Sequence, residues 1–164
     1  ISGGAGITRN ISPFQNGGIP APEGEQHALI QQAGSFSQTV SGFEIGADYT
    51  LSLLAMARQR NPIGNDLEVL LDAGLSSEIV LLDLAAVTDS SFTEYESASF
   101  LAEKDTYDLT IRSTVVGADQ TTFFDNVFFN QQSFVVPEPT TIAIWTLLGI
   151  ITVGISVVRR RRKA

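Results

Sequence analysis

The feature that most constrains the fold is an alternation of apolar and polar residues along short segments of the chain. Residues 107–115 place four apolar side chains on one face, and these are Tyr107, Leu109, Ile111 and Val115. Residues 49–59 and 66–74 alternate in a similar way, the latter with Asp66, Glu68 and Asp72 on its polar face. Because successive side chains of a strand point to opposite faces of a sheet, this period of two predicts β-strands.

Five further segments have the composition of strands, and turns rich in Gly, Asn, Asp and Pro separate them. These segments are 26–34, 35–43, 78–87, 95–102 and 121–130. Short strands separated by turns at intervals of about 8–12 residues are typical of sandwiches and barrels. We therefore predict an all-β fold, an antiparallel β-sandwich. The Leu-rich segment 66–87 also fits a helix, which is the alternative for that part of the chain.

The composition divides the chain into three parts. Residues 1–25 are rich in Gly and Pro and are predicted to be irregular. Residues 26–135 contain the alternating segments and are predicted to form the β-sandwich domain, which is long enough to bury a core without disulfides. Residues 136–164 form a tail of a different composition.

The distribution of charge excludes one class of partner. Residues 1–139 contain all 18 acidic residues but only five of the ten Lys and Arg, a formal net charge of −13. Binding to phosphate groups needs a basic face, so nucleic acid is excluded as a partner. An acidic surface favours solubility and cations such as Ca²⁺. The chain has no cysteine, which rules out disulfides and thiolate metal sites.

The tail combines three signals in a fixed order. These are Pro137, Glu138 and Pro139, an uncharged apolar run from Ile142 to Val158, and a basic cluster of Arg159, Arg160, Arg161, Arg162 and Lys163. A helix over residues 140–158 would be close to the minimum length for crossing a bilayer, with Trp145 near the interface. The positive-inside rule places the basic cluster in the cytoplasm and the N-terminus outside. A buried core helix is the alternative, although such helices are rarely apolar on every face.

In this order and at this end of the chain, the three signals resemble a PEP-CTERM protein-sorting domain. The resemblance covers residues 136–164. It implies a bacterial protein that is exported through an N-terminal signal peptide and recognised by an exosortase. It also implies that the tail is cleaved near the Pro-Glu-Pro motif and that the body reaches the cell surface or the extracellular matrix.

The residues that support catalysis are few. His27 is the only histidine, the chain has no Gly-x-Ser-x-Gly motif, and one His without Cys makes a zinc site hard to build. Glycoside hydrolysis needs only two carboxylates, so this class stays open. We predict that the protein is not an enzyme and that His27 is an ordinary surface or core-edge residue.

Asp125 is the candidate metal ligand. In the predicted strand 121–130 it shares a face with Phe123, Val127 and Phe129, which makes it an acid among apolar neighbours. A buried carboxylate needs a partner, such as a metal ion, an Arg or several backbone N–H groups. The alternatives are a hydrogen bond to a neighbouring turn, or a strand bulge that directs the side chain outward.

The body also resembles a known family. Its segments 38–59, 65–72 and 92–129 are similar to the galactose-binding-domain-like jelly rolls found in many carbohydrate-binding modules. The resemblance covers about residues 18–130 and implies a jelly roll with a structural Ca²⁺ ion, held by Asp125 and groups from the beginning of the domain. The strand that usually precedes the Gly-rich opening is not in this sequence. Without it, the calcium site would lack ligands and one sheet would have an open edge.

The same resemblance implies a sugar-binding surface. Glycan sites need exposed aromatic rings, but the body has no Trp, and the pattern assigns Tyr49 and Tyr107 to the core. The candidate ligand-binding residues that remain are Tyr95, Arg58, Arg60 and Asn61.

These observations predict an exported, non-catalytic β-sandwich module that binds carbohydrate and is directed to the cell envelope or matrix by its tail. Its expected partners are the membrane, an exosortase and a polysaccharide. The alternative is a structural or adhesive matrix protein without a defined ligand. A glycoside hydrolase or lyase on the same scaffold is the third possibility, and a cleft with two carboxylates, one of raised pKa, would favour it.

Overall fold

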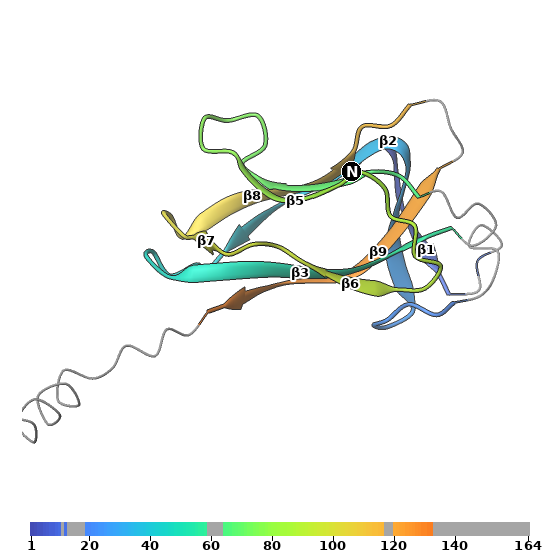
Figure 1. Ribbon diagram of the computed structural model, residues 1–164, viewed down its shortest axis with the longest axis horizontal. Coiled ribbons are helices and arrows are strands. Elements are labelled where there is room, and N and C mark those ends of the chain that lie inside the picture. Colours follow the sequence, from blue (N-terminus) through green and yellow to red (C-terminus); the bar gives the residue numbers. More distant parts are fainter. Residues whose placement is uncertain (11, 13–18, 59–63, 117–119, 133–164) are drawn as a thin grey trace, which may run out of the picture. The chain divides into compact units, whose positions relative to one another are not determined.

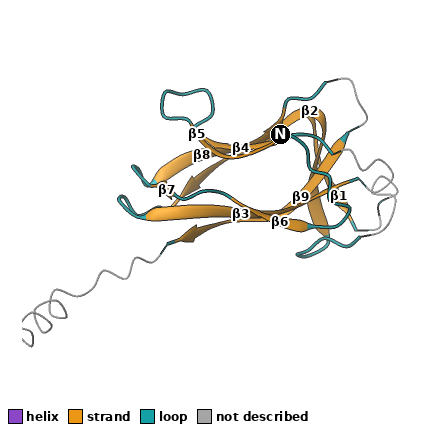
Figure 2. Ribbon diagram, viewed as in Figure 1, coloured by secondary structure: helices purple, strands orange, loops and turns teal. Residues whose placement is uncertain are grey.

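The computed structural model describes residues 1–10, 12, 19–58, 64–116 and 120–132. All regular elements in these ranges are strands, as Figure 2 shows. They are β1 (Ser2–Arg9), β2 (Gln26–Ser41), β3 (Asp48–Ala57), β4 (Leu67–Leu71), β5 (Ile79–Leu84), β6 (Thr93–Glu96), β7 (Phe100–Leu101), β8 (Thr106–Ser113) and β9 (Thr121–Gln131). Every pairing between them is antiparallel, which confirms the predicted all-β sandwich.

The strands follow the order β5-β4-β8-β2-β9-β3-β6, with β1 paired to β2 and β7 paired to β3. Figure 1 shows two layers, with β8 and β5 in one layer and β3, β6 and β9 in the other. Strand β2 belongs to both layers, because residues 28–31 pair with β9 and residues 34–41 pair with β8. The sandwich is therefore one sheet that turns back on itself along β2.

The bend of β2 lies between these two pairing segments. Gln32 has a positive φ of 58°, a conformation that residues other than glycine rarely adopt. The buried side-chain amide of Asn65 donates to the carbonyl oxygens of Ile30 and Gln32, at 3.0 and 3.1 Å. On the other side, β1 approaches so closely that a Cβ on Gly4 would lie 1.8 Å from the Gln31 carbonyl oxygen. Asn65 and Gly4 thus hold the bend from both sides.

The core lies between the layers, and β3, β4 and β8 contribute side chains to it. Tyr49, Leu51, Leu53 and Ala55 all belong to the buried core cluster, as their alternation predicted. They meet Leu67, Val69 and Leu71 of β4 together with Tyr107, Leu109 and Ile111 of β8. Each of these positions follows the period of two, so the pattern identified both the strands and their buried faces.

Two predictions about the extent of the strands were wrong. Residues 1–25 are not irregular throughout, because Ser2–Arg9 form a strand whose Gly residues allow the close approach to β2. Segments 26–34 and 35–43 form one bent strand instead of two. The helical alternative for residues 66–87 is also wrong, since these residues form β4, β5 and the turn between them.

A bulge in β9 changes the predicted face of Asp125. Asn126 has a positive φ of 52°, and the register with β3 shifts by one residue between the pairs Leu54–Asp125 and Ser52–Phe128. Asp125 therefore shares the outer face with Phe123, whereas Val127 and Phe129 pack against the core. The prediction of a common face for Asp125, Val127 and Phe129 was wrong because one extra residue reverses the alternation.

The predicted tail, including the helix 140–158 and the basic cluster 159–163, lies outside the described residues. Within the ranges that the structure describes, no helix is long and apolar enough to cross a membrane. The tail thus stays a prediction from the sequence.

Candidate functional site

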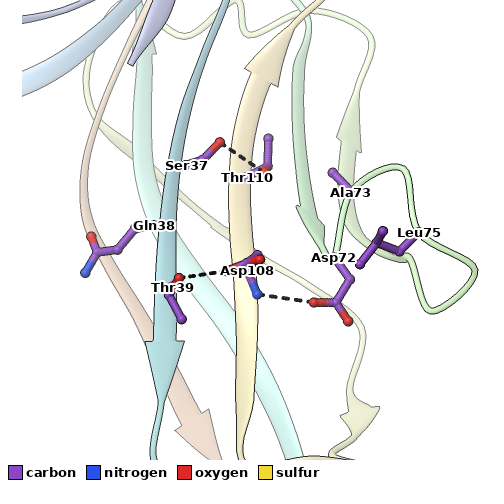
Figure 3. A pocket seen from close by; sticks show the side chains of 8 residues that line it. All are labelled: Ser37, Gln38, Thr39, Asp72, Ala73, Leu75, Asp108 and Thr110. Atoms are coloured by element: carbon purple, nitrogen blue, oxygen red, sulfur yellow. Dashed lines mark hydrogen bonds between the residues drawn. The ribbon is translucent and has the colours of Figure 1, made fainter.

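A groove of about 410 Å³ lies on the outer face of β2 and β8, beside the turn that follows β4. Figure 3 shows its lining, which consists of Ser37, Gln38, Thr39, Asp72, Ala73, Leu75, Asp108 and Thr110. The floor comes from the polar positions of the two alternating strands, whose apolar positions face the core. The turn after β4 supplies the wall.

The floor is a ladder of short polar side chains. Across the β2–β8 pair, the hydroxyl groups of Ser37 and Thr110 lie 3.3 Å apart. In the next row, the Thr39 hydroxyl donates to the Asp108 carboxylate at 2.7 Å (Figure 3). Both rows are exposed, so their remaining lone pairs and protons are available to a ligand.

Asp72 holds the wall in place. Its side chain is only 2% exposed and accepts hydrogen bonds from the backbone N–H of Asp108, at 3.2 Å, and from the Ser77 hydroxyl, at 2.9 Å. Lys104 completes an ion pair with the same carboxylate. Burial alone would raise the pKa of Asp72, but the hydrogen bonds and the charge of Lys104 outweigh it and keep this pKa below its ordinary value. The carboxylate is therefore ionised and fixed.

The chemistry of the groove is that of a polar ligand site with one apolar edge. Leu75 is 59% exposed at the top of the wall and offers that edge. The floor offers hydroxyl groups that donate and accept, and the Asp108 carboxylate accepts only. Such a surface can pair with a ligand that carries many hydroxyl groups.

Of the predicted sugar-binding residues, Tyr95 and Arg58 do not line this groove. The ring of Tyr95 packs against the core, and its hydroxyl donates to Asp89 at 2.6 Å. Burial and the hydrogen bond to the negative Asp89 raise the pKa of Tyr95 to about 12. Arg58 follows β3 and donates its backbone N–H to Thr121, whereas Arg60 and Asn61 lie outside the described residues. A ligand role for these four residues stays a prediction.

The structure places Asp125 at the divergence of β2 and β9. Its carboxylate accepts the backbone N–H of Asn126 at 2.9 Å and that of Glu23 at 3.2 Å. A hydrogen bond to a neighbouring turn and a strand bulge were the two alternatives to a metal ion, and both occur here. No cluster of three acidic, His or Cys side chains suited to a metal occurs in the ranges described. Calcium at Asp125 stays a prediction, and the backbone N–H of Glu23 links the carboxylate to the beginning of the domain.

His27 is buried, with 2% of its surface exposed, on the outer side of the layer formed by β2, β9 and β3. Its ring meets Phe92 and Phe123 edge to face, with centroid distances of 5.6 and 5.1 Å. Neither ring nitrogen has a hydrogen-bond partner among the described residues. Burial lowers the pKa of His27, and the negative charge of Asp125 opposes this effect without cancelling it. The imidazole is therefore neutral.

In the alternating segment 107–115, Asp108 and Thr110 fall between the apolar positions, and Ser37 and Thr39 lie in segment 35–43, which was predicted to be a strand. It could not show that the two strands are neighbours, because pairing between residues so far apart leaves no local signal. Phe128 was also missed. It is 38% exposed on the outer face opposite Ser52, and the bulge at Asn126 is the reason for its orientation.

No protein-family model matches the chain, and no match was found among curated proteins. Solved structures do share its fold. TmCBM61, in complex with β-1,4-galactotriose, is 16% identical over 79% of this chain and 83% of its own length, with a TM-score of 0.55. The CBM22-1 xylan-binding domain of Paenibacillus barcinonensis Xyn10C is 13% identical over 82% and 85%, with a TM-score of 0.54.

A third similar structure is the arabinose-bound α-L-arabinofuranosidase MgGH51. It is 17% identical over 81% of this chain but only 23% of that chain, with a TM-score of 0.51. At such identities the similarity shows the fold. The chain thus has the β-sandwich fold that carbohydrate-binding modules also have. This agrees with the fold that the resemblance of the body implied.

The burial of His27 predicts a dependence of stability on pH. In the unfolded chain the histidine takes up a proton as the pH falls below 6.5, while the buried ring, with its lowered pKa, stays neutral. The free energy of unfolding should therefore decrease as the pH falls from 6.5 through the pKa of the folded protein. His27→Phe keeps the ring between Phe92 and Phe123 and should remove this decrease. Urea unfolding at pH values from about 7.5 to 5 measures both proteins. Equal slopes for the two proteins would contradict the prediction.

Proposed function

We propose that residues 1–132 form a non-catalytic module that binds carbohydrate in the groove on β2 and β8. The observation that carries this proposal is the ladder of Ser37, Thr39, Asp108 and Thr110 on a sandwich of the carbohydrate-binding-module type. Sugars present hydroxyl groups that both donate and accept, and a floor of hydroxyl groups with the exposed Asp108 carboxylate complements them.

The roles of individual residues follow from their chemistry. The Asp108 carboxylate accepts from a sugar hydroxyl and forms the stronger, charge-assisted hydrogen bond. Ser37 and Thr110 can donate or accept, since their mutual bond of 3.3 Å is long and easily exchanged. Leu75 covers the apolar face of a ring. Asp72 positions the wall and the backbone of Asp108 and does not itself face the ligand.

A catalytic role is less well supported. A glycosidase requires a carboxylic acid whose pKa is raised so that it can donate a proton. Asp72, whose carboxylate accepts the backbone N–H of Asp108, has its pKa lowered instead. The structural or adhesive role remains the alternative, and it requires that the groove bind no glycan.

A binding screen tests the proposed function. Soluble galactan, xylan and arabinan are offered to the wild type, to Asp108→Ala and to Asp83→Ala, a control that removes an exposed carboxylate from β5 outside the groove. We expect saturable binding of at least one polysaccharide, weakened about tenfold by Asp108→Ala because one charge-assisted hydrogen bond is lost. The control should bind like the wild type. A folded wild type that binds none of a broad glycan panel would leave the adhesive role as the better account.

We also propose the structural Ca²⁺ ion that the jelly-roll resemblance implies, with Asp125 as a ligand. The proposal is supported by the carboxylate's position between the beginning of the domain and β9. If the ion binds, excess Ca²⁺ should raise the melting temperature by several degrees relative to EDTA. Asp125→Asn should abolish the difference, whereas Asp105→Asn, on the turn before β8, should retain it. Identical melting temperatures in Ca²⁺ and in EDTA would contradict the proposed calcium site.

Residues 136–164 are proposed to be a sorting and anchoring signal of the PEP-CTERM type. The support is the order of Pro137-Glu138-Pro139, the uncharged segment 140–158 and the basic cluster 159–163. We infer that the body lies outside the membrane, that the basic cluster lies in the cytoplasm, and that an exosortase recognises the motif.

Fractionation of expressing cells tests the tail. The full chain should sediment with membranes and resist extraction by carbonate, whereas a chain ending at residue 135 should not. A full chain that stays in the soluble fraction would contradict the anchor. Substitution of the basic cluster by Ser is expected to give a mixture of membrane orientations. The accessibility of the body to an external protease measures this change.

A further inference from the structure

The groove on β2 and β8 contains an exposed carboxylate that has no basic partner. Asp108 lies on the floor and accepts a hydrogen bond from the Thr39 hydroxyl at 2.7 Å (Figure 3). In the part of the chain that the structure describes, no basic side chain forms an ion pair with it. The two oxygens of a carboxylate offer about four acceptor positions, so most of this capacity is open to a ligand.

Two neighbouring acids differ from Asp108, because each already has a basic partner. Asp72, in the wall of the groove, is paired with Lys104, at 2.5 Å between Nζ and a carboxylate oxygen. Two rows along the outer face of β8, Arg112 is paired with Glu68 at 2.6 Å. Both basic side chains near the groove are therefore neutralised, and the negative charge of Asp108 is left for a ligand.

Basic residues are scarce throughout the body. Of the residues that the structure describes, four are Lys or Arg, and these are Arg9, Arg58, Lys104 and Arg112. Residues 1–139 have a formal net charge of −13. The field of such a body attracts cations and repels acidic polysaccharides. The groove therefore favours a ligand of positive charge over one of negative charge.

The surroundings of Asp108 indicate a sugar as the carrier of that charge. The hydroxyl groups of Ser37 and Thr110 form the next row of the same two strands. Rows two residues apart along a strand are separated by about 6.7 Å, so hydroxyl groups of a sugar held at Asp108 can reach this row. A simple amine would use the carboxylate alone, whereas an amino sugar would use the carboxylate and the hydroxyl row together.

We propose that the groove binds a polysaccharide with free amino groups, and that the Asp108 carboxylate pairs with one ammonium group of this ligand. The inference rests on the proposed function and names the class of its ligand. The ammonium group donates to Asp108, while hydroxyl groups of the same sugar or the next one pair with Ser37 and Thr110. N-acetylation of the ligand removes the positive charge and leaves only the weaker hydrogen bond of a neutral amide.

Oligosaccharides that differ only in N-acetylation test the charge. Glucosamine pentamers of β-1,4 and β-1,6 linkage, and the N-acetylated form of each, are titrated by calorimetry into the full chain in a non-ionic detergent. At about pH 6 the free amino groups are protonated. We expect at least one amine form to bind about three- to fivefold tighter than its acetylated form, which is the effect of one exposed ion pair. An increase of NaCl from about 20 mM to about 500 mM should abolish the difference, because salt screens exposed charges.

Two Asn substitutions show whether the preference comes from Asp108. Asp108→Asn keeps an oxygen that can accept from Thr39, and it should lose the preference for the amine forms. Asp83→Asn removes an exposed carboxylate from β5, on the same face but outside the groove, and should retain the preference. Circular dichroism verifies that both variants fold like the wild type.

The possible results separate this inference from the proposed function. Equal binding of the two forms, or tighter binding of the acetylated form, would overturn the inference and leave the groove as a site for neutral sugars. A preference that Asp108→Asn retains, or that Asp83→Asn lowers equally, would overturn it too, since the preference would then come from the net charge of the body. Binding of neither form would also overturn it. The proposed function would still be decided by the screen with galactan, xylan and arabinan, so the two can fail separately.

Discussion

The bend of β2 is the constraint on which the rest of the structure depends. This strand pairs with β9 in one layer and with β8 in the other. Its backbone therefore has to turn without leaving buried polar groups unpaired. The Asn65 amide supplies the missing donors for Ile30 and Gln32. Because the two halves of β2 then diverge, the two layers separate and a core forms between them.

The strands and their buried faces could be predicted because they depend on a period that the sequence displays locally. Tyr49, Leu51 and Leu53 show this most clearly, since these alternate positions are all apolar and all buried. The neighbours of each strand could not be predicted in this way. Thr39 and Asp108 form one row of the groove, yet nothing near either residue indicates the other.

The two wrong predictions about the face that a side chain takes share a physical cause, which is a single residue of irregular backbone. Asn126, with its positive φ, moves Val127 and Phe129 to the core and Phe128 to the surface. Asp72, also at positive φ, ends β4 with its carboxylate buried, although its place in the alternation predicted exposure. Asn and Asp tolerate this conformation better than most residues, so such positions in a strand are where a period of two is least reliable.

Strand β2 serves the core and the groove with alternate side chains. Phe36 and Val40 pack against the core, whereas Ser37 and Thr39 point outward and form part of the groove floor. A charged side chain at either outward position would compete with Asp108 for a polar ligand. Short, neutral side chains such as Ser and Thr suit the floor, because their hydroxyl groups can pair with a polar ligand without filling the groove. The alternation along β2 therefore has one physical explanation that covers the core and the proposed site together.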